Sequence, residues 1–115
     1  MKVEHYTRTP AEPVTMDGAK NVTVRWLITD KDGAPNFAMR LFEIEPGGHT
    51  PRHQHPYEHE VFVLEGEGVL LAGEVEHRLE PGVVAYVPPD ALHQFKSTGT
   101  TPLKMLCIIP QQRSG

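Results

Sequence analysis

The sequence predicts an all-β barrel or sandwich, and three observations point to this fold class. The apolar runs are short and rich in β-branched side chains, as strands are. Eleven prolines and ten glycines interrupt these runs, which favours many turns over long helices. No stretch repeats its apolar residues every 3.6 positions with a capping residue at each end, so no long helix is expected.

The first two strands are predicted on either side of a polar loop. Residues 22–28 form a β-branched run, and residues 30–36 contain the Asp-Gly and Pro-Asn pairs that mark turns. The second strand covers residues 37–44 and should end at residues 45–48, Glu-Pro-Gly-Gly. Residues 9–20 show no clear pattern, so they could form an arm or an irregular edge.

Six further strands follow in the second half of the chain, each bounded by Gly or Pro. Two of them form a hairpin around Gly73-Glu74, and another is stopped by Pro88-Pro89-Asp90. A spacing of about 8 to 12 residues between strands is typical of sandwiches and closed barrels. The expected ranges are 58–64, 69–72, 75–79, 83–87, 93–96 and 103–109.

The chain length of 115 residues suits a single domain over residues 1–115. We expect an N-terminal arm over about residues 1–20 and a barrel over about residues 21–110. Composition is 38% hydrophobic and 23% charged, which is typical of a globular protein and not of a disordered one.

Charge and hydropathy exclude several classes of partner. The formal net charge is −4, and the lysines and arginines are scattered, so no nucleic-acid partner is expected. No apolar run is long enough to cross a membrane, and residues 1–10 lack the apolar segment of a signal peptide. The single cysteine, Cys107, excludes an internal disulfide, and a cytoplasmic location is the expectation.

Histidines carry the chemical signal. Of the seven in the chain, His53, His55 and His59 share the parity that places side chains on one face of an extended segment. Neutral imidazole is a good ligand for divalent transition metals. His93, just past the Pro-Pro-Asp turn, is the candidate for a fourth ligand. This pattern predicts a metal site in the barrel.

Two motifs give the chain a resemblance to small single-domain members of the cupin superfamily. Gly47, five residues, His53-x-His55, three residues, His59, six residues and Gly66 follow the frame of the first cupin motif. In that frame His59 stands in the slot where the family usually has Glu. Glu60 fits a longer-spaced version of the motif, but parity and the distance to Gly66 favour His59.

The second cupin motif is also present. Gly82, five residues, Pro88-Pro89-Asp90, two residues, His93, three residues and Ser97 match its spacing. Asp90 replaces the usual Gly and Ser97 replaces the usual Asn, both at turn or strand-end positions that tolerate these residues.

The resemblance implies the fold, the cofactor and a class of function. The fold would be a cupin double-stranded β-helix, a jelly-roll barrel. It would hold one divalent transition metal ion, either Mn, Fe, Ni, Cu or Zn, on His53, His55, His59 and His93. The implied function is a metal-dependent enzyme of oxygenase or isomerase type acting on a small molecule, with the metal as Lewis acid or redox centre. The alternative is a non-catalytic module that binds or senses a small ligand, and no catalytic residue is identified.

The pocket lining is less clear from sequence. Met105, Cys107 and Ile109 share one face of the last strand; Ile109 is expected in the core, while Met105 and Cys107 could line the pocket. Arg40 is expected on the outer face, with binding of a substrate anion as the alternative, because a charge inside a barrel needs a partner. Two aromatic residues are expected in the core or an interface: Trp26 and Tyr57.

The resemblance also implies a homodimer. A barrel of this size has edge strands that must be protected. We expect residues 3–14 to lie across a partner subunit.

Overall fold

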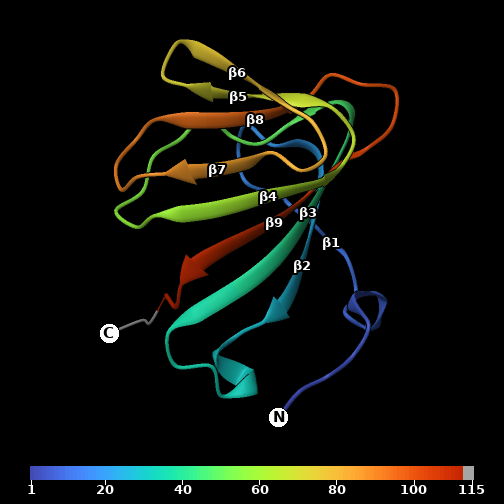
Figure 1. The fold of residues 1–115 in the computed structure, drawn as a ribbon, viewed down its shortest axis with the longest axis vertical. Coiled ribbons are helices and arrows are strands. Elements are labelled where there is room, and N and C mark those ends of the chain that lie inside the picture. The colour runs from blue at the N-terminus through green and yellow to red at the C-terminus, as the bar shows by residue number, and fades with distance from the viewer. Residues whose placement is uncertain (113–115) are drawn as a thin grey trace.

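The computed structural model describes residues 1–112, which contain nine strands and two short 3₁₀ helices (Figure 1). None of the helices in this described part is long and apolar enough to cross a membrane. The helices are η1 (Tyr6–Arg8) and η2 (Asp30–Asp32). The strands are β1 (Glu12–Pro13), β2 (Lys20–Ile28), β3 (Phe37–His49), β4 (His59–Glu65), β5 (Gly68–Ala72), β6 (Val75–Leu79), β7 (Val84–Val87), β8 (His93–Ser97) and β9 (Leu103–Pro110).

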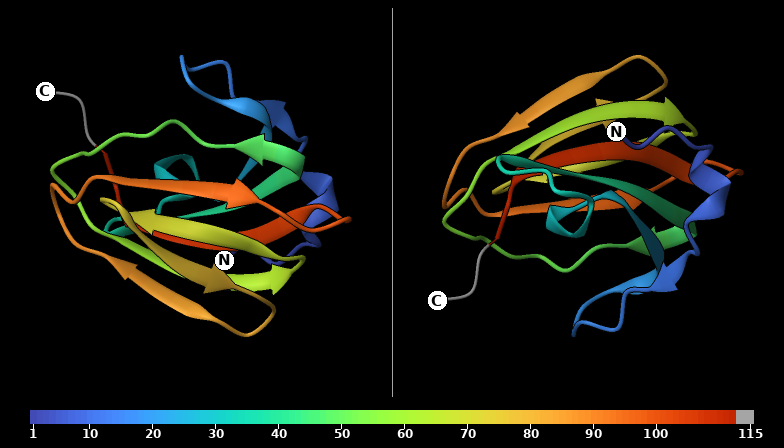
Figure 2. Two further views of the ribbon diagram at one scale, coloured as in Figure 1. Left: turned by 90° about the horizontal axis from the view of Figure 1, so that it is seen from above. Right: turned by 90° about the horizontal axis from the view of Figure 1, so that it is seen from below.

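The strands pair antiparallel in the order β6-β5-β8-β3-β9-β4-β7, and β2 and β1 extend from β3. Figure 2, which looks along the long axis from both ends, shows that the sheet curls on itself. Strands β3 and β8 share a single register pair, His49 with Lys96, so the sheet folds over at this point into two layers. The predicted all-β jelly-roll class is confirmed.

The predicted end of the second strand is wrong. Strand β3 was expected to end at residues 45–48 but continues to His49. Gly47 adopts a left-handed φ of 80°, which lets the strand kink instead of ending. Gly48 lies against backbone, since an added Cβ would come within 2.6 Å of the Lys20 carbonyl oxygen. The kink carries β3 from one layer of the sheet to the other.

The N-terminal arm lies along its own chain. Strand β1 pairs with β2, and Arg25 Nη1 donates a hydrogen bond to the Thr9 carbonyl at 2.5 Å. The Arg25 guanidinium also lies 5.4 Å from the centre of the Tyr6 ring. These contacts place the arm over the outer side of β2, and its expected role in a homodimer stays a prediction.

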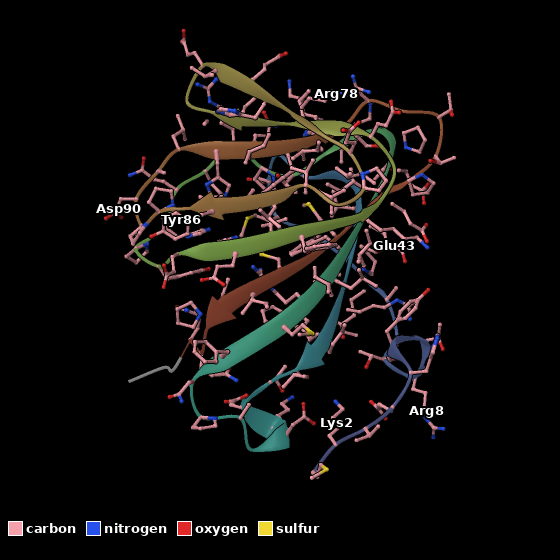
Figure 3. All side chains as sticks on the ribbon, viewed as in Figure 1. Lys2, Arg8, Glu43, Arg78, Tyr86 and Asp90 are labelled. Atoms are coloured by element: carbon pink, nitrogen blue, oxygen red, sulfur yellow. The ribbon has the colours of Figure 1, made fainter. Side chains whose placement is uncertain are left out.

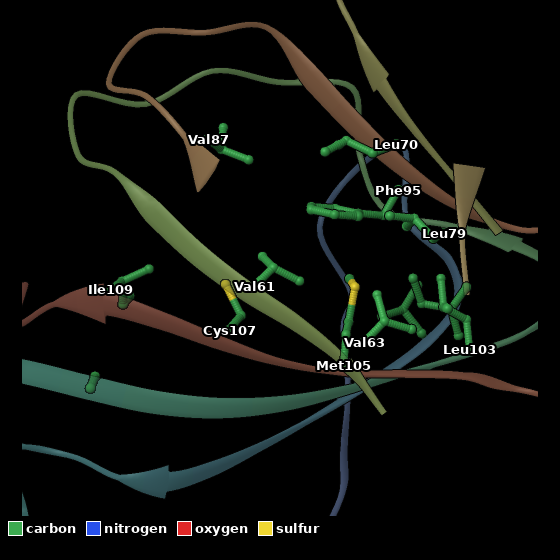
Figure 4. Close-up of a cluster of buried hydrophobic side chains, with 13 residues drawn as sticks. Val61, Val63, Leu70, Leu79, Val87, Phe95, Leu103, Met105, Cys107 and Ile109 are labelled. Carbon is green, nitrogen blue, oxygen red and sulfur yellow. The ribbon is translucent and has the colours of Figure 1, made fainter. Parts of the chain in front are cut away.

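The core fills the space between the two layers (Figure 4). Alternate residues of β9 point inward and are almost fully buried: Leu103, Met105, Cys107 and Ile109. Figure 4 shows the sulfur atoms of Met105 and Cys107 on the same side of β9, directed into this interior. The core position expected for Ile109 is confirmed.

Candidate metal centre

Backbone pairing brings two distant histidines together. His53 and His93 exchange hydrogen bonds: the His53 N–H donates to the His93 carbonyl at 3.1 Å, and the His93 N–H donates to the His53 carbonyl at 3.0 Å. His93 opens β8, and His59 opens β4. The intervening segment alternates as predicted, because Arg52 and Gln54 are exposed while the histidines are not.

Three of the predicted ligands form a cluster with suitable spacing. One donor atom from each of His53, His55 and His93 lies within 4.8 Å of the others. Two nitrogen ligands on one ion stand about 3 to 4 Å apart, given a metal–nitrogen distance of about 2.0–2.1 Å. The donor set is therefore chemically suited to a divalent transition metal ion.

Hydrogen bonds fix the tautomers of two of these rings. His55 Nδ1 lies 3.0 Å from the Tyr57 carbonyl oxygen, and His93 Nδ1 lies 2.9 Å from the Ala91 carbonyl oxygen. A carbonyl only accepts, so in each ring Nδ1 carries the proton and Nε2 keeps its lone pair. A hydrogen bond from the nitrogen that does not bind the metal fixes the orientation of a metal-binding histidine.

The remaining predicted ligand, His59, lies beside the cluster. His59 is 5% exposed, and its Nε2 lies 2.5 Å from His55 Nε2. Its ring is nearly parallel to that of His55, with centroids 4.1 Å apart, and lies 5.3 Å from the ring of His93. An ion bound by both rings would require these two nitrogens to stand about 3 to 4 Å apart, so the His59 ring would have to shift slightly. That His59 completes the ligand set stays a prediction.

Glu60, the competing residue, points the other way. It is exposed and pairs with Tyr86 across β4 and β7 on the outside of the barrel. The carboxylates of Glu58 and Glu60 raise the pKa of the Tyr86 hydroxyl, chiefly through its hydrogen bond to Glu58. Figure 3 shows Tyr86 near Asp90 at this edge of the molecule.

Burial favours the neutral form of three of the histidines, His53, His59 and His93. Desolvation is the main cause that lowers the pKa of His53 and of His93. For His59, desolvation together with the nearby Arg40 charge lowers the pKa to about 2. Neutral imidazoles offer lone pairs to a metal at physiological pH.

The histidines line a cavity of about 390 Å³. Its walls are mostly apolar and aromatic, and Glu12 is the only carboxylate among the described residues that line it. Met105 and Cys107, for which the sequence left pocket lining open, both line this cavity. Trp26 and Tyr57 line it as well, and Tyr57 stacks on His55 with ring centroids 4.1 Å apart.

Arg40 also lines the cavity, so its predicted outer position is wrong. It is directly opposite Cys107 in the β3–β9 register, on the inward face, and is 8% exposed. Its Nη2 donates to Cys107 Sγ at 2.9 Å. The sequence held no decisive signal, because Leu41 on the opposite face of β3 is buried as well.

The Asp90 substitution in the second motif has a clear geometric basis. Asp90 adopts a left-handed φ of 64°, a conformation that glycine adopts freely and Asp tolerates better than most residues. Its N–H donates to the His55 carbonyl at 2.8 Å, which ties this turn to a ligand-bearing segment.

Comparisons with known proteins agree with the predicted family. A model of the cupin domain matches residues 40–109. The 1.2 Å structure of the polyketide cyclase RemF from Streptomyces resistomycificus is similar over 100% of this chain and 82% of that chain, with 36% identity and a TM-score of 0.92.

Two curated relatives are also similar over part of their length. The chain is 34% identical over 89 residues to the dimethylsulfoniopropionate lyase DddW of Ruegeria pomeroyi, which covers 72% of this chain and 59% of that protein. It is 31% identical over 75 residues to 1-methylthio-D-xylulose 5-phosphate methylsulfurylase of Rhodospirillum rubrum, which covers 65% of this chain and 48% of that protein. The chain thus spans about half to three fifths of these two relatives.

Proposed function

The chain belongs to the cupin domain family, and on that basis we propose that it is a metal-dependent cyclase acting on a small molecule that carries several ketone groups. The observation that carries the proposal is the cluster of histidines at the wall of a mostly apolar cavity of about 390 Å³. The likeness to a polyketide cyclase over the whole chain supports this reaction over the oxygenase or isomerase chemistry expected from sequence.

In this proposal His53, His55, His59 and His93 hold one divalent ion. Such an ion would supply Lewis-acid polarisation of a substrate carbonyl. The Tyr57 and Ala91 carbonyls keep two of these ligands, His55 and His93, in the required tautomer. Trp26, Phe42 and Phe95 line the same cavity, so they provide a surface that folds an extended chain and excludes water.

The cavity also constrains the substrate. Glu12, the single carboxylate among its described lining residues, is exposed on the short strand β1. No buried carboxylate is therefore available as a general base. The substrate must supply an acidic C–H of its own, and a methylene between two ketones has one. Poly-β-ketones meet this requirement.

The proposed step is an intramolecular aldol condensation. The methylene carbon loses a proton and forms a bond to a carbonyl carbon of the same chain. The carbonyl oxygen gains a proton and becomes a hydroxyl, so the ring is closed at this step. The hydroxyl and the second hydrogen of the former methylene then leave as water, which forms a double bond in the ring. No oxidant or reductant is required.

The test is a product analysis with a synthetic linear triketo thioester. The purified protein with its bound metal should accelerate ring formation and narrow the product mixture relative to buffer alone, as followed by liquid chromatography with mass detection. His53→Ala should abolish the effect, while His77→Ala, which removes an exposed histidine on β6, should leave it intact. A product mixture identical to that in buffer would overturn the proposal and favour a non-catalytic ligand-binding module. Oxygen consumption in the same assay would favour an oxygenase.

A further inference from the structure

The guanidinium of Arg40 is a buried positive charge that pairs with no carboxylate of residues 1–112. Arg40 is 8% exposed, and none of the ion pairs in residues 1–112 includes it. Arginine does not lose its proton in proteins, so the charge persists. A buried charge is costly unless it is paired.

The contacts that Arg40 does make leave part of its hydrogen-bonding capacity unused. Nη2 donates to Cys107 Sγ, a weak acceptor. The buried Nε–H has no hydrogen-bond partner among the described residues. The guanidinium also lies 5.3 Å from the centre of the Trp26 ring and 4.8 Å from that of Phe42, which offsets some of the charge.

The surroundings of Arg40 favour an anion in the cavity. Arg40, Trp26 and Phe42 all line it together with the histidines. Only one sulfur atom separates the guanidinium from His59, because Cys107 Sγ contacts both. With neutral imidazoles and a divalent ion, this end of the cavity would carry a strong positive charge, and none of the described residues that line it supplies a buried carboxylate to balance that charge.

We propose that Arg40 binds an oxyanion of the substrate, either a carboxylate or the enolate of a diketone, and so determines which substrates the cavity accepts. This inference rests on the proposed function, because it assigns a second attachment point for the same substrate. The planar guanidinium presents parallel N–H donors that suit a planar oxyanion. The flanking Trp26 and Phe42 rings would hold the Arg40 guanidinium in place.

The test compares three cyclic probes of similar size. Cyclohexanecarboxylate carries a carboxylate, cyclohexane-1,3-dione is an enolate at neutral pH, and cyclohexanone is uncharged. The ring of the dione holds its oxygens apart, so it cannot chelate a metal. Affinities are measured by isothermal titration calorimetry on the metal-loaded protein as purified.

Arg40→Met should weaken binding of at least one oxyanion probe by about 10- to 100-fold, the effect of removing a hydrogen bond to a charged group. The affinity of Arg40→Lys for this probe should lie between those of Arg40→Met and the wild type. Lysine keeps the positive charge but lacks the parallel N–H donors of the guanidinium. Arg78→Met is the matched control: Arg78 is exposed on β6, near the top of Figure 3, and the variant should behave as wild type. Cyclohexanone binding should not change in any variant.

The probes also separate the two sources of the oxyanion. Selective loss of the carboxylate probe assigns Arg40 to a carboxylate, and selective loss of the dione assigns it to an enolate. Equal affinities of Arg40→Met and wild type for both probes, or no binding of either probe to wild type, would overturn the proposal.

Folding measurements distinguish ligand binding from a structural role. Without a probe, Arg40→Met should unfold at the same temperature as wild type or higher, because it removes an unpaired buried charge. A lower unfolding temperature with unchanged probe affinity would assign Arg40 to structure alone. If Arg40→Met does not fold, Arg40→Lys carries the comparison. The probes are not cyclised, so Arg40-dependent binding would stand even if the cyclase assay failed, and the reverse outcome would overturn only this inference.

Discussion

The Cys107 Sγ atom lies 3.1 Å from Nδ1 of His59, inside the barrel. This contact is on the side of the imidazole away from the histidine cluster, since His59 Nε2 faces His55. Cys107 therefore holds the ring of His59 in position, as residues that contact the outer nitrogen of a metal-binding histidine do.

Replacing Cys107 with Ala should loosen this ring. We expect Cys107→Ala to lower the unfolding free energy by about 1–3 kcal/mol, because Arg40 Nη2 and His59 Nδ1 both lose their partner. Metal affinity should fall by about 10-fold or more. Competition with a chromogenic chelator measures the affinity. Cys107→Ser keeps an acceptor and should retain more of it; equal affinity in all three proteins would refute the positioning role.

Stability of the metal-free protein should fall as the pH falls below about 6.5, where histidines of the unfolded chain become protonated. Burial lowers the pKa of His59 to about 2, so in the folded chain this histidine takes up a proton only at a much lower pH. The unfolded state then binds more protons, and each one costs up to about 1.4 kcal/mol of stability per pH unit. The contribution of His59 to stability is therefore fully present above about pH 6.5 and is lost as the pH falls toward its folded pKa of about 2.

Urea unfolding at pH 7 and pH 5 after chelator treatment measures this dependence. His59→Gln should reduce the loss of stability between the two pH values, whereas His77→Gln, at an exposed position, should not. A loss of the same size in His59→Gln and wild type would show that His59 does not contribute.

Two glycines of the first motif should respond differently to alanine. Gly47 and Gly66 both have a left-handed φ, of 80° and 83°. An added Cβ meets nothing within 4 Å at Gly47, but at Gly66 it collides with the Pro102 carbonyl oxygen. Gly47→Ala should cost about 1–2 kcal/mol and Gly66→Ala distinctly more. Equal unfolding midpoints in urea would contradict the contact seen at Gly66.

Besides the N-terminal arm, the outer face of β4 and β7 is expected to contribute to a homodimer. Phe62 is 45% exposed and Val84 is 70% exposed, and they are register partners on this face. Contiguous exposed apolar side chains mark interaction surfaces. Sedimentation should give twice the chain mass of 12.9 kDa, and Val84→Glu should halve it. Val75→Glu is the control, because Val75 is also an exposed valine but lies on the β5–β6 hairpin. A monomeric wild type would rule out the dimer.

Much of this fold could be predicted from local pattern. Strand positions follow from β-branched runs and turn residues, and the inward facing of His53 and His55 follows from parity, because the exposed Arg52 and Gln54 alternate with them. The assignment of His93 follows from its place after the Pro-Pro-Asp turn and from motif spacing. The backbone pairing of His93 with His53 is a long-range contact that no local pattern encodes.

Other features could not be predicted, for physical reasons. Both faces of β3 are covered, so Arg40 and Leu41 are buried side by side and parity could not place the arginine. The kink at Gly47 looks like a turn in sequence, yet the strand continues because the backbone of Lys20 pairs with it at His49.

Metal content of matched variants tests the central claim, a divalent ion held by four histidines. Wild type purified without added metal should contain about one divalent transition metal ion per chain, measured by inductively coupled plasma mass spectrometry. Glu60→Ala and His77→Ala should keep it, because both side chains are exposed, while His59→Ala should lose most of it. Equal metal content in His59→Ala and Glu60→Ala would contradict the four-histidine site.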